Sequence, residues 1–315
     1  MAFIQTVRGP VAPGEVGFTL PHEHTRCVLW HIPARWDYWQ LTGEDEVIVP
    51  ELARFRDAGG TCLVDVTLPA IGRDPRRLLR LSEASGLHVV MGCGWYRDAY
   101  YPAADDIDRG TVDELADRLV AESTEGVDGT GIRPGIIGEI GTDKPWLTAR
   151  EERVHRAVAR AARRTGLAIT THAVMSDVGL AQLRVFEEEG ADPTRVIIGH
   201  ADSYPDLAHY LALIGRGASI EFDFLGMSFT PQERAGEPRV IALVLELLSR
   251  GHAGQLLFSQ DVCHDGQLSA FGGHGYTYLQ ETFLPRLTAA GVDAATLQAI
   301  TIDNPRRLLS LPGTP

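Results

Sequence analysis

The sequence predicts an α/β fold in which eight parallel strands alternate with helices and close into a single (β/α)8 barrel, or TIM barrel. Short apolar runs rich in β-branched residues recur along the chain, and segments of helical period separate them. Most of these segments end near a glycine, as helix C-termini often do. Eight such pairs in 315 residues give an ordinary size for a barrel. We expect one domain over residues 1–315, with a short N-terminal extension over residues 1–15.

The predicted strands are continuously apolar rather than alternating, which is typical of strands that are buried on both faces. In chain order they cover residues 17–20, 61–67, 88–93, 135–141, 168–173, 195–200, 218–224 and 256–261.

The predicted helices lie between these strands and after the last one. They cover residues 44–59, 74–86, 111–126, 148–166, 177–190, 206–217, 238–251, 275–291 and 294–310. A doubly wound sheet is the alternative fold, and it would need a glycine-rich phosphate loop after an early strand. The glycines in the run GCG at 92–94 lead into WYRDAYYP, which is neither a helix start nor a dinucleotide fingerprint, so the barrel is favoured.

Composition argues against several classes of function. The formal net charge of −13 argues against nucleic acid or an anionic membrane as a partner, since both attract basic patches. No run approaches the roughly 18 apolar residues of a membrane span, and the N-terminus lacks the apolar stretch of a signal peptide. We therefore expect a cytoplasmic protein with reduced thiols, because its cysteines show no C-x-x-C spacing: Cys27, Cys62, Cys93 and Cys263.

Candidate metal ligands stand at the ends of five predicted strands. In a barrel the carboxyl ends of all strands meet at one mouth, where active sites lie. Imidazoles and carboxylates in that position are the ligands of zinc and related ions. The candidates are His22, His24, Glu139, His172, His200 and Asp261.

The first of these strands ends in the pattern H-x-H. His22 and His24 would point to the same side of a strand and could bind one ion together. A polar loop after a strand is the plainer interpretation of that pair, and a core or loop histidine is the plainer interpretation of His172 or His200. The occurrence of histidines and carboxylates at several separate strand ends favours a metal site. Four nitrogens and two carboxylates are more ligands than one tetrahedral zinc with an open position can take. They suit two ions that share a carboxylate and a water.

On these and further motifs the chain resembles the phosphotriesterase-related family of the amidohydrolase superfamily. The matching motifs run in order through nearly the whole chain: TVRGPV, LPHEH, VDVTLPAIGRDP, GIIGEIGT, THA, GHAD, SQDVCHDGQL, GGHGYTYL, FLPRL and DNPRRLL. The resemblance implies a TIM barrel with two divalent ions that hydrolyses esters, lactones, phosphotriesters or amides. We expect zinc, with manganese, cobalt or iron as alternatives.

The resemblance also assigns the ligands. His22, His24 and Asp261 would hold the more buried ion, and His172 and His200 the more exposed one. Asp261 would also be catalytic, since it would take the proton of the attacking water and pass it toward the leaving group.

The bridging ligand separates branches of the family, because many members use a carboxylated lysine on the fourth strand. Here the strand at 135–141 contains no lysine, and the chain's only lysine, Lys144, follows it in TDKPW. Glu139 would bridge the ions directly, as in the glutamate-bridged members.

Three residues are candidates for contact with the substrate. Lactonase-type members carry an arginine after the seventh strand, and Phe224 takes that place here, which argues against a plain quorum-sensing lactonase. Tyr96 matches an aromatic position that lines the pocket in relatives. His274 lies in the glycine-rich run FGGHGY, predicted to lie over the site. Ordinary loop packing is the alternative for Tyr96 and His274.

Other polar residues have open roles. The strand-end acids Asp65, Glu221 and Asp223 would either orient a ligand imidazole or cap a loop. His264 stays open, and Glu23 would face away from the two histidines in a structural role. The aromatic stretch at 29–41 could cover the mouth or form a homodimer interface.

The sequence therefore predicts a metal-dependent hydrolase of a small-molecule ester, lactone or amide, which uses a hydroxide that bridges two ions. Three alternatives stay open: an organophosphate triester hydrolase, a binding protein without turnover on the same barrel, and a mononuclear deaminase-type enzyme that would not need Glu139 as a ligand.

Overall fold

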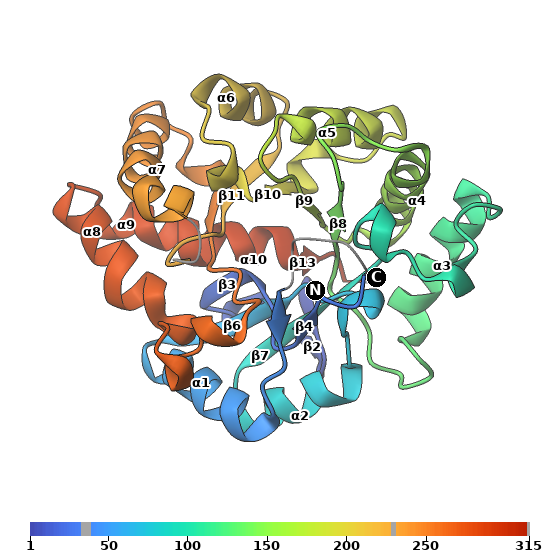
Figure 1. The fold of residues 1–315 in the computed structure, drawn as a ribbon, viewed down its shortest axis with the longest axis horizontal. Helices are drawn as coiled ribbons and strands as arrows, with labels where there is room; N and C mark the ends of the chain where they lie inside the picture. The colour runs from blue at the N-terminus through green and yellow to red at the C-terminus, as the bar shows by residue number, and fades with distance from the viewer. Residues whose placement is uncertain (33–38, 228–230, 314–315) are drawn as a thin grey trace.

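Eight parallel strands form the central sheet of the protein, whose computed structural model describes residues 1–32, 39–227 and 231–313. Neighbouring strands follow each other in chain order, and Figure 1 shows helices around the outside of the ring. The prediction of a (β/α)8 barrel is confirmed. The strands are β3 (Phe18–Glu23), β6 (Gly60–Asp65), β7 (His88–Cys93), β8 (Ile136–Gly141), β9 (Ile169–His172), β10 (Val196–Gly199), β11 (Ser219–Phe222) and β12 (Leu256–Phe258).

The strands β3 and β12 meet where the ring closes. There the amide of His22 donates to Ser259 Oγ at 3.0 Å, and that oxygen lies 2.9 Å from the His22 carbonyl oxygen. The amide of Asp261 adds a bond of 3.3 Å to the same carbonyl. Strand β12 ends at Phe258, so Asp261 lies three residues past the strand on which it was predicted.

Most helices lie within a few residues of their predicted ranges. The first seven are α1 (Asp45–Asp57), α2 (Pro75–Ser85), α3 (Val112–Glu125), α4 (Ala149–Thr165), α5 (Val178–Glu188), α6 (Leu207–Gly215) and α7 (Pro231–Ser249). The sequence explains where two of these helices begin. Thr111 and Glu114 form a capping box at the start of α3, and Thr148 and Glu151 form one at the start of α4. Among the described residues, no helix has the length and apolarity needed to cross a bilayer.

The last two predicted helices are each broken into shorter pieces. The range 275–291 contains a π-helical turn at Leu279–Phe283 before α8 (Leu284–Ala289). The range 294–310 contains α9 (Ala294–Gln298), a second π-helical turn at Ala299–Asp303, and α10 (Asn304–Leu309).

A small antiparallel sheet that was not predicted joins the two ends of the chain. It contains β1 (Phe3–Thr6), β2 (Gly9–Val11) and the two-residue strand β13 (Ser310–Leu311). A second pair, β4 (Cys27–Val28) and β5 (Gln40–Leu41), brackets the aromatic stretch at 29–41. Residues 33–38 of that stretch lie outside the described residues, and the homodimer stays a prediction.

The ladder between β8 and β9 is interrupted at the position of Glu139. Ile137 pairs with Ile169, and the register shifts before Ile140 pairs with Thr171. Gly138 has a φ of 129°, and a Cβ there would lie 2.2 Å from the Thr170 carbonyl oxygen. Only glycine fits this position, and the irregular backbone re-aims the next side chain, as bulges near active sites often do.

Candidate metal centre

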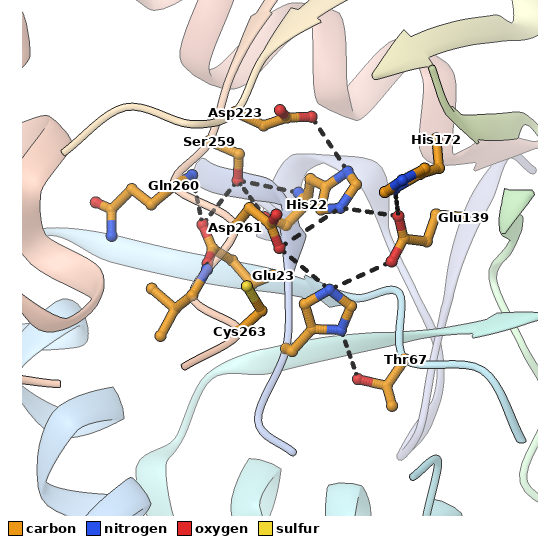
Figure 2. Close-up of polar contacts among 12 residues, drawn as sticks. His22, Glu23, Thr67, Glu139, His172, Asp223, Ser259, Gln260, Asp261 and Cys263 are labelled. Atoms are coloured by element: carbon orange, nitrogen blue, oxygen red, sulfur yellow. Dashed lines mark hydrogen bonds and ion pairs between the residues drawn. The ribbon is translucent and has the colours of Figure 1, made fainter. Parts of the chain in front are cut away.

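The structure brings the six predicted ligands together at one end of the barrel, as Figure 2 shows for those that it labels. Three lie on the strands β3, β8 and β9, and two follow β3 and β10 directly. All six are buried: His22, His24, Glu139, His172, His200 and Asp261.

Glu139 lies in the middle of this group. Its Oε1 atom is 3.4 Å from His24 Nε2, while its Oε2 atom is 2.9 Å from His172 Nδ1 and 3.5 Å from His200 Nε2. The two oxygens of one carboxylate therefore face histidines from different sides of the cluster. Lys144, in contrast, lies exposed in the loop after β8.

Asp261 faces the histidines of the first strand. Its Oδ1 atom is 3.2 Å from His24 Nε2 and 3.9 Å from His22 Nε2. Asp261 and His200 both have left-handed backbone conformations, with φ of 45° and 57°. Such conformations are uncommon outside glycine and cluster at functional sites, where the surrounding structure holds them.

The donor atoms lie close enough together to hold a divalent metal. Two ligands of a tetrahedral zinc lie about 3.4 Å apart when each bond is about 2.05 Å. The separations here run from 2.7 Å, between His172 Nδ1 and His200 Nε2, to 3.9 Å. His22 Nε2 and Asp261 Oδ1 are also buried without a hydrogen-bond partner among the described residues. Native proteins rarely leave such atoms unsatisfied, and an ion would satisfy both.

The carboxyl groups in the cluster are held in their charged form by the surrounding histidines. Burial raises the pKa of Glu139, but hydrogen bonds from His172, His200 and His24 outweigh burial and hold that pKa well below its usual range. Burial likewise raises the pKa of Asp261, while His24 and the charge of His22 bring it below its ordinary value. Both carboxyls are therefore buried anions, and the positive charge that stabilises them comes from the neighbouring histidines or from a metal ion that takes their place.

The histidines respond to the same surroundings in different ways. Burial lowers the pKa of His172 to about 4, helped by the positive charge of His200, so its ring is neutral and offers a lone pair. Burial lowers the pKa of His22 as well, but Asp223 and Glu221 raise it to about 9. An ion that binds there has to displace a proton from His22.

In three of the four imidazoles, the ring nitrogen that faces away from the cluster has its own polar neighbour. His24 Nδ1 lies 2.8 Å from Thr67 Oγ1, and His200 Nδ1 lies 2.7 Å from Asp223 Oδ1. His22 Nδ1 lies 3.3 Å from Asp223 and 3.7 Å from Glu221. Such contacts orient a metal-binding imidazole and fix which nitrogen carries the proton.

Asp65 acts differently from the other strand-end acids. Its Oδ2 atom accepts hydrogen bonds from the amide and hydroxyl of Thr25, and its Oδ1 atom accepts one from the amide of Thr67. Asp65 therefore does not contact an imidazole itself. It positions Thr67, and Thr67 contacts His24. The sequence reasoning missed Thr67, although it lies two residues after Asp65 in the quoted motif VDVT.

Glu23 points away from the cluster and toward the backbone around Asp261. Its Oε1 atom accepts hydrogen bonds from Ser259 Oγ and the Gln260 amide, and its Oε2 atom accepts one from the Val262 amide, all at 2.8 Å. Glu23, predicted to have a structural role, thus fixes the loop that carries Asp261 (Figure 2).

Two of the three predicted substrate-contact residues lie against the cluster. The Tyr96 hydroxyl is 3.4 Å from His172 Nδ1, and the ring is almost fully buried. The Phe224 ring stacks on the imidazole of His200, with ring centres 4.5 Å apart and planes inclined by 24°. Aromatic walls of this kind limit the access of water to a site.

The third residue, His274, lies farther along the mouth. It lines a cavity of about 80 Å³ together with Gly273, Gly275, Tyr278 and the neighbours of Asp261, Gln260 and Val262. Its ring packs on Tyr278 at 4.7 Å. His264 accepts a hydrogen bond from the Gly266 amide and packs against Trp39, which makes it part of the loop structure.

Comparisons with known proteins point to one family. The sequence model of the phosphotriesterase family matches residues 2–309. An N-acetyltaurine hydrolase from Dictyostelium discoideum is 33% identical over 276 residues, which cover 85% of this chain and 74% of that protein.

Two solved structures have the same overall architecture. A resiniferatoxin-binding protein from Rhodobacter sphaeroides superposes with a TM-score of 0.89 and 33% identity, covering 98% of this chain and 94% of that one. A lactonase from Listeria monocytogenes gives a TM-score of 0.88 and 28% identity, covering 98% of both chains.

Proposed function

Because the chain belongs to the phosphotriesterase family, we propose that it is a binuclear hydrolase that cleaves a carboxylic amide, ester or lactone. The chain is a metal-dependent hydrolase of this family, and its substrate is a small molecule. The bond that is cleaved, the number of ions and the nucleophile are the parts that we propose.

The position of Glu139 carries the proposal. One carboxylate oxygen faces His24, and the other faces His172 and His200. A carboxylate placed in this way can join two ions without the carboxylated lysine that other members use. A single-ion centre would leave one of its oxygens with no ion to bind.

Two groups of residues would hold the ions. His22, His24 and Asp261 would hold one ion, His172 and His200 would hold the other, and Glu139 would bridge them. Zinc suits these ligands, as do manganese, cobalt and iron. When bound, a pair of such ions supplies a bridging hydroxide at neutral pH and a Lewis acid for the scissile carbonyl.

Asp261 is the residue that moves the proton. Its carboxylate is buried and anionic, and its Oδ1 atom faces the centre of the cluster, where the nucleophile would lie. Oδ1 would accept the proton of the nucleophile and return it to the leaving amine or alcohol. Glu23 holds the backbone on both sides of Asp261, so this oxygen needs little reorganisation during the reaction.

The walls of the site favour an acyl substrate, and an amide is our first choice. Tyr96 and Phe224 confine the scissile group near His172 and His200. Phe224 stands where lactonase-type members have an arginine, and the N-acetyltaurine hydrolase among the relatives is named for cleavage of an amide. A lactone or ester is the second choice, and an organophosphate triester is the alternative outside the acyl class.

Metal analysis together with a substrate panel tests the proposal. The protein is stripped with EDTA, reloaded with zinc, manganese or cobalt, and assayed with N-acyl amino compounds, lactones, aryl esters and a phosphotriester. We expect two ions per chain and hydrolysis of N-acyl compounds that EDTA abolishes. Fewer than two ions, with activity that EDTA leaves unchanged, would overturn it.

A binding role without turnover is the second candidate. The observation that favours it is the similarity to a protein described as resiniferatoxin-binding, which is 33% identical. An intact set of six candidate ligands favours catalysis instead. Tight binding of an acyl compound by the metal-loaded protein, with no turnover of any compound in the panel, would favour the binding role.

A further inference from the structure

We propose that Asp223 is a positioning residue shared by the two halves of the candidate metal centre: it supports one histidine of each ion, so that both ions depend on a single carboxylate. The inference rests on the proposed function, which assigns His22 to one ion and His200 to the other. It adds to that function one residue through which both ions are gained or lost.

The first half of the argument is the contact between Asp223 and His200. Asp223 follows β11 directly, and its side chain is completely buried. Its Oδ1 atom lies 2.7 Å from His200 Nδ1. The amide of His200 donates to the same carboxylate, at 3.0 Å from Oδ2 and 3.1 Å from Oδ1. This carboxylate therefore holds both the ring of His200 and its left-handed backbone, whose φ is 57°.

The second half is the contact between the same carboxylate and the first barrel strand. Asp223 Oδ2 lies 3.3 Å from His22 Nδ1, and Figure 2 shows the aspartate facing that ring. The rings of His22 and His200 are themselves close, with centres 4.9 Å apart. The chain thus places one fixed anion beside the imidazoles of two ligands that lie 178 residues apart in sequence.

The opposite nitrogens of these two rings meet at the proposed bridge. His22 Nε2 lies 3.6 Å from Glu139 Oε2, and His200 Nε2 lies 3.5 Å from the same oxygen. Each ring therefore stands between Asp223 on one side and Glu139 on the other. An imidazole whose one nitrogen faces a fixed carboxylate presents its other nitrogen to an ion in a defined direction. Asp223 thus aims one ligand of each ion at the position where the two ions would share Glu139.

A second acid on the same strand provides a matched control. Glu221 lies two residues before Asp223 and is equally buried, and its Oε2 atom is 3.7 Å from His22 Nδ1. Its ion pairs among the described residues include His22 and do not include His200. Glu221→Gln therefore makes the same acid-to-amide change, on the same strand, beside a ligand of one ion.

The test measures metal binding by the full chain as wild type, Asp223→Asn and Glu221→Gln, each stripped with EDTA. Competition with chromogenic chelators gives the zinc affinity of both binding steps. We expect Asp223→Asn to weaken both steps by about tenfold to a hundredfold, and Glu221→Gln to weaken at most one. Titration with cobalt, followed by visible absorption, adds a spectroscopic readout. In Asp223→Asn the bands of both the first and the second equivalent should change, because a ligand of each ion is no longer aimed.

Different results overturn the two proposals. Two ions in the wild type, with one step or neither weakened in Asp223→Asn, would reject the shared role and leave the binuclear hydrolase standing. Equal losses of both steps in Asp223→Asn and Glu221→Gln would also reject it, because the loss of a buried charge, and not of a shared contact, would then explain them. A wild type that binds fewer than two ions would overturn the two-ion centre, and this inference with it.

Thermal unfolding in EDTA verifies that each variant folds without metal. If Asp223→Asn does not fold, Asp223→Glu takes its place, since it keeps the charge and moves the oxygens by one methylene. It should also weaken both binding steps, and wild-type affinity at either step would reject the shared role.

Discussion

The carboxyl group of Glu23 holds the backbone on both sides of Asp261, because its two oxygens accept hydrogen bonds from the amides of residues 260 and 262, each at 2.8 Å. Asp261 has a left-handed backbone conformation, which the surrounding structure must maintain. These hydrogen bonds join the first barrel strand to the loop after the last one. The position of Asp261, the candidate proton acceptor, therefore depends on Glu23, the residue between the two histidines of the H-x-H motif.

Replacing Glu23 by glutamine should therefore damage the site more than the fold. The glutamine NH2 group would face backbone donors, so at least one of the three hydrogen bonds is lost, at a cost of about 1–3 kcal/mol. We expect kcat/KM and metal affinity to fall by about tenfold to a hundredfold. Metal titration and steady-state kinetics measure both, with Glu83→Gln, at an exposed position of helix α2, as the control. Wild-type metal affinity and turnover in Glu23→Gln would contradict this role.

Thr67 should support metal binding through His24. Thr67→Val keeps the shape of the side chain but removes the oxygen that lies 2.8 Å from His24 Nδ1. Metal affinity should fall by about tenfold to a hundredfold, as is usual when such a contact is lost. Competition with a chromogenic chelator measures it. Thr170→Val is the matched control, since that buried hydroxyl has no hydrogen-bond partner among the described residues. Equal affinities in the two variants would exclude the support by Thr67.

Metal removal should destabilise the folded chain, because ions held by buried ligands such as Glu139 and Asp261 would bind the folded chain and not the unfolded one. Restoring zinc to a free concentration of about 100 times its Kd should raise the free energy of unfolding by about 2.7 kcal/mol for each independent site. Urea unfolding of stripped and reloaded protein measures the difference. An unchanged urea midpoint on zinc addition would show that zinc does not bind the native cluster.

The buried histidine of helix α4 should make stability depend on pH. Burial lowers the pKa of His155 from 6.5 to about 4, although its Nδ1 donates to the Glu151 carbonyl at 2.7 Å. Between these values the unfolded chain binds a proton that the folded chain does not. The free energy of unfolding therefore falls as the pH drops from about 6.5 toward 4.

The size of this effect can be isolated by substitution. Between pH 7.5 and pH 5, the wild type should lose about 2 kcal/mol more than His155→Gln, which cannot titrate. Urea unfolding at the two pH values measures the loss, and His252→Gln is expected to behave as the wild type. The same pH dependence in His155→Gln and the wild type would assign the loss to other groups.

The barrel and the cluster of candidate ligands could be predicted from the sequence, because both follow from local patterns. Continuous apolar strands alternate with amphipathic helices, and His22, His24 and His172 stand at strand ends, which meet at one mouth in any such barrel. Asp261 was also predicted, although it lies past β12, because its motif follows the strand closely.

The contacts that orient the cluster could not be predicted in the same way. Thr67 lies 43 residues from His24, and Ser259 lies 236 residues from Glu23, so only the closed barrel brings each pair together. The strand β13 has two residues and no periodicity of its own, which is why the sheet that joins the chain ends was missed.

The most direct test of this account is the metal content and amide hydrolysis of Glu139→Ala beside the wild type. We predict two ions per chain in the wild type, and in the variant one ion or none, with hydrolysis reduced by at least about a hundredfold. Two ions per chain and wild-type turnover in Glu139→Ala would contradict the bridging role of Glu139.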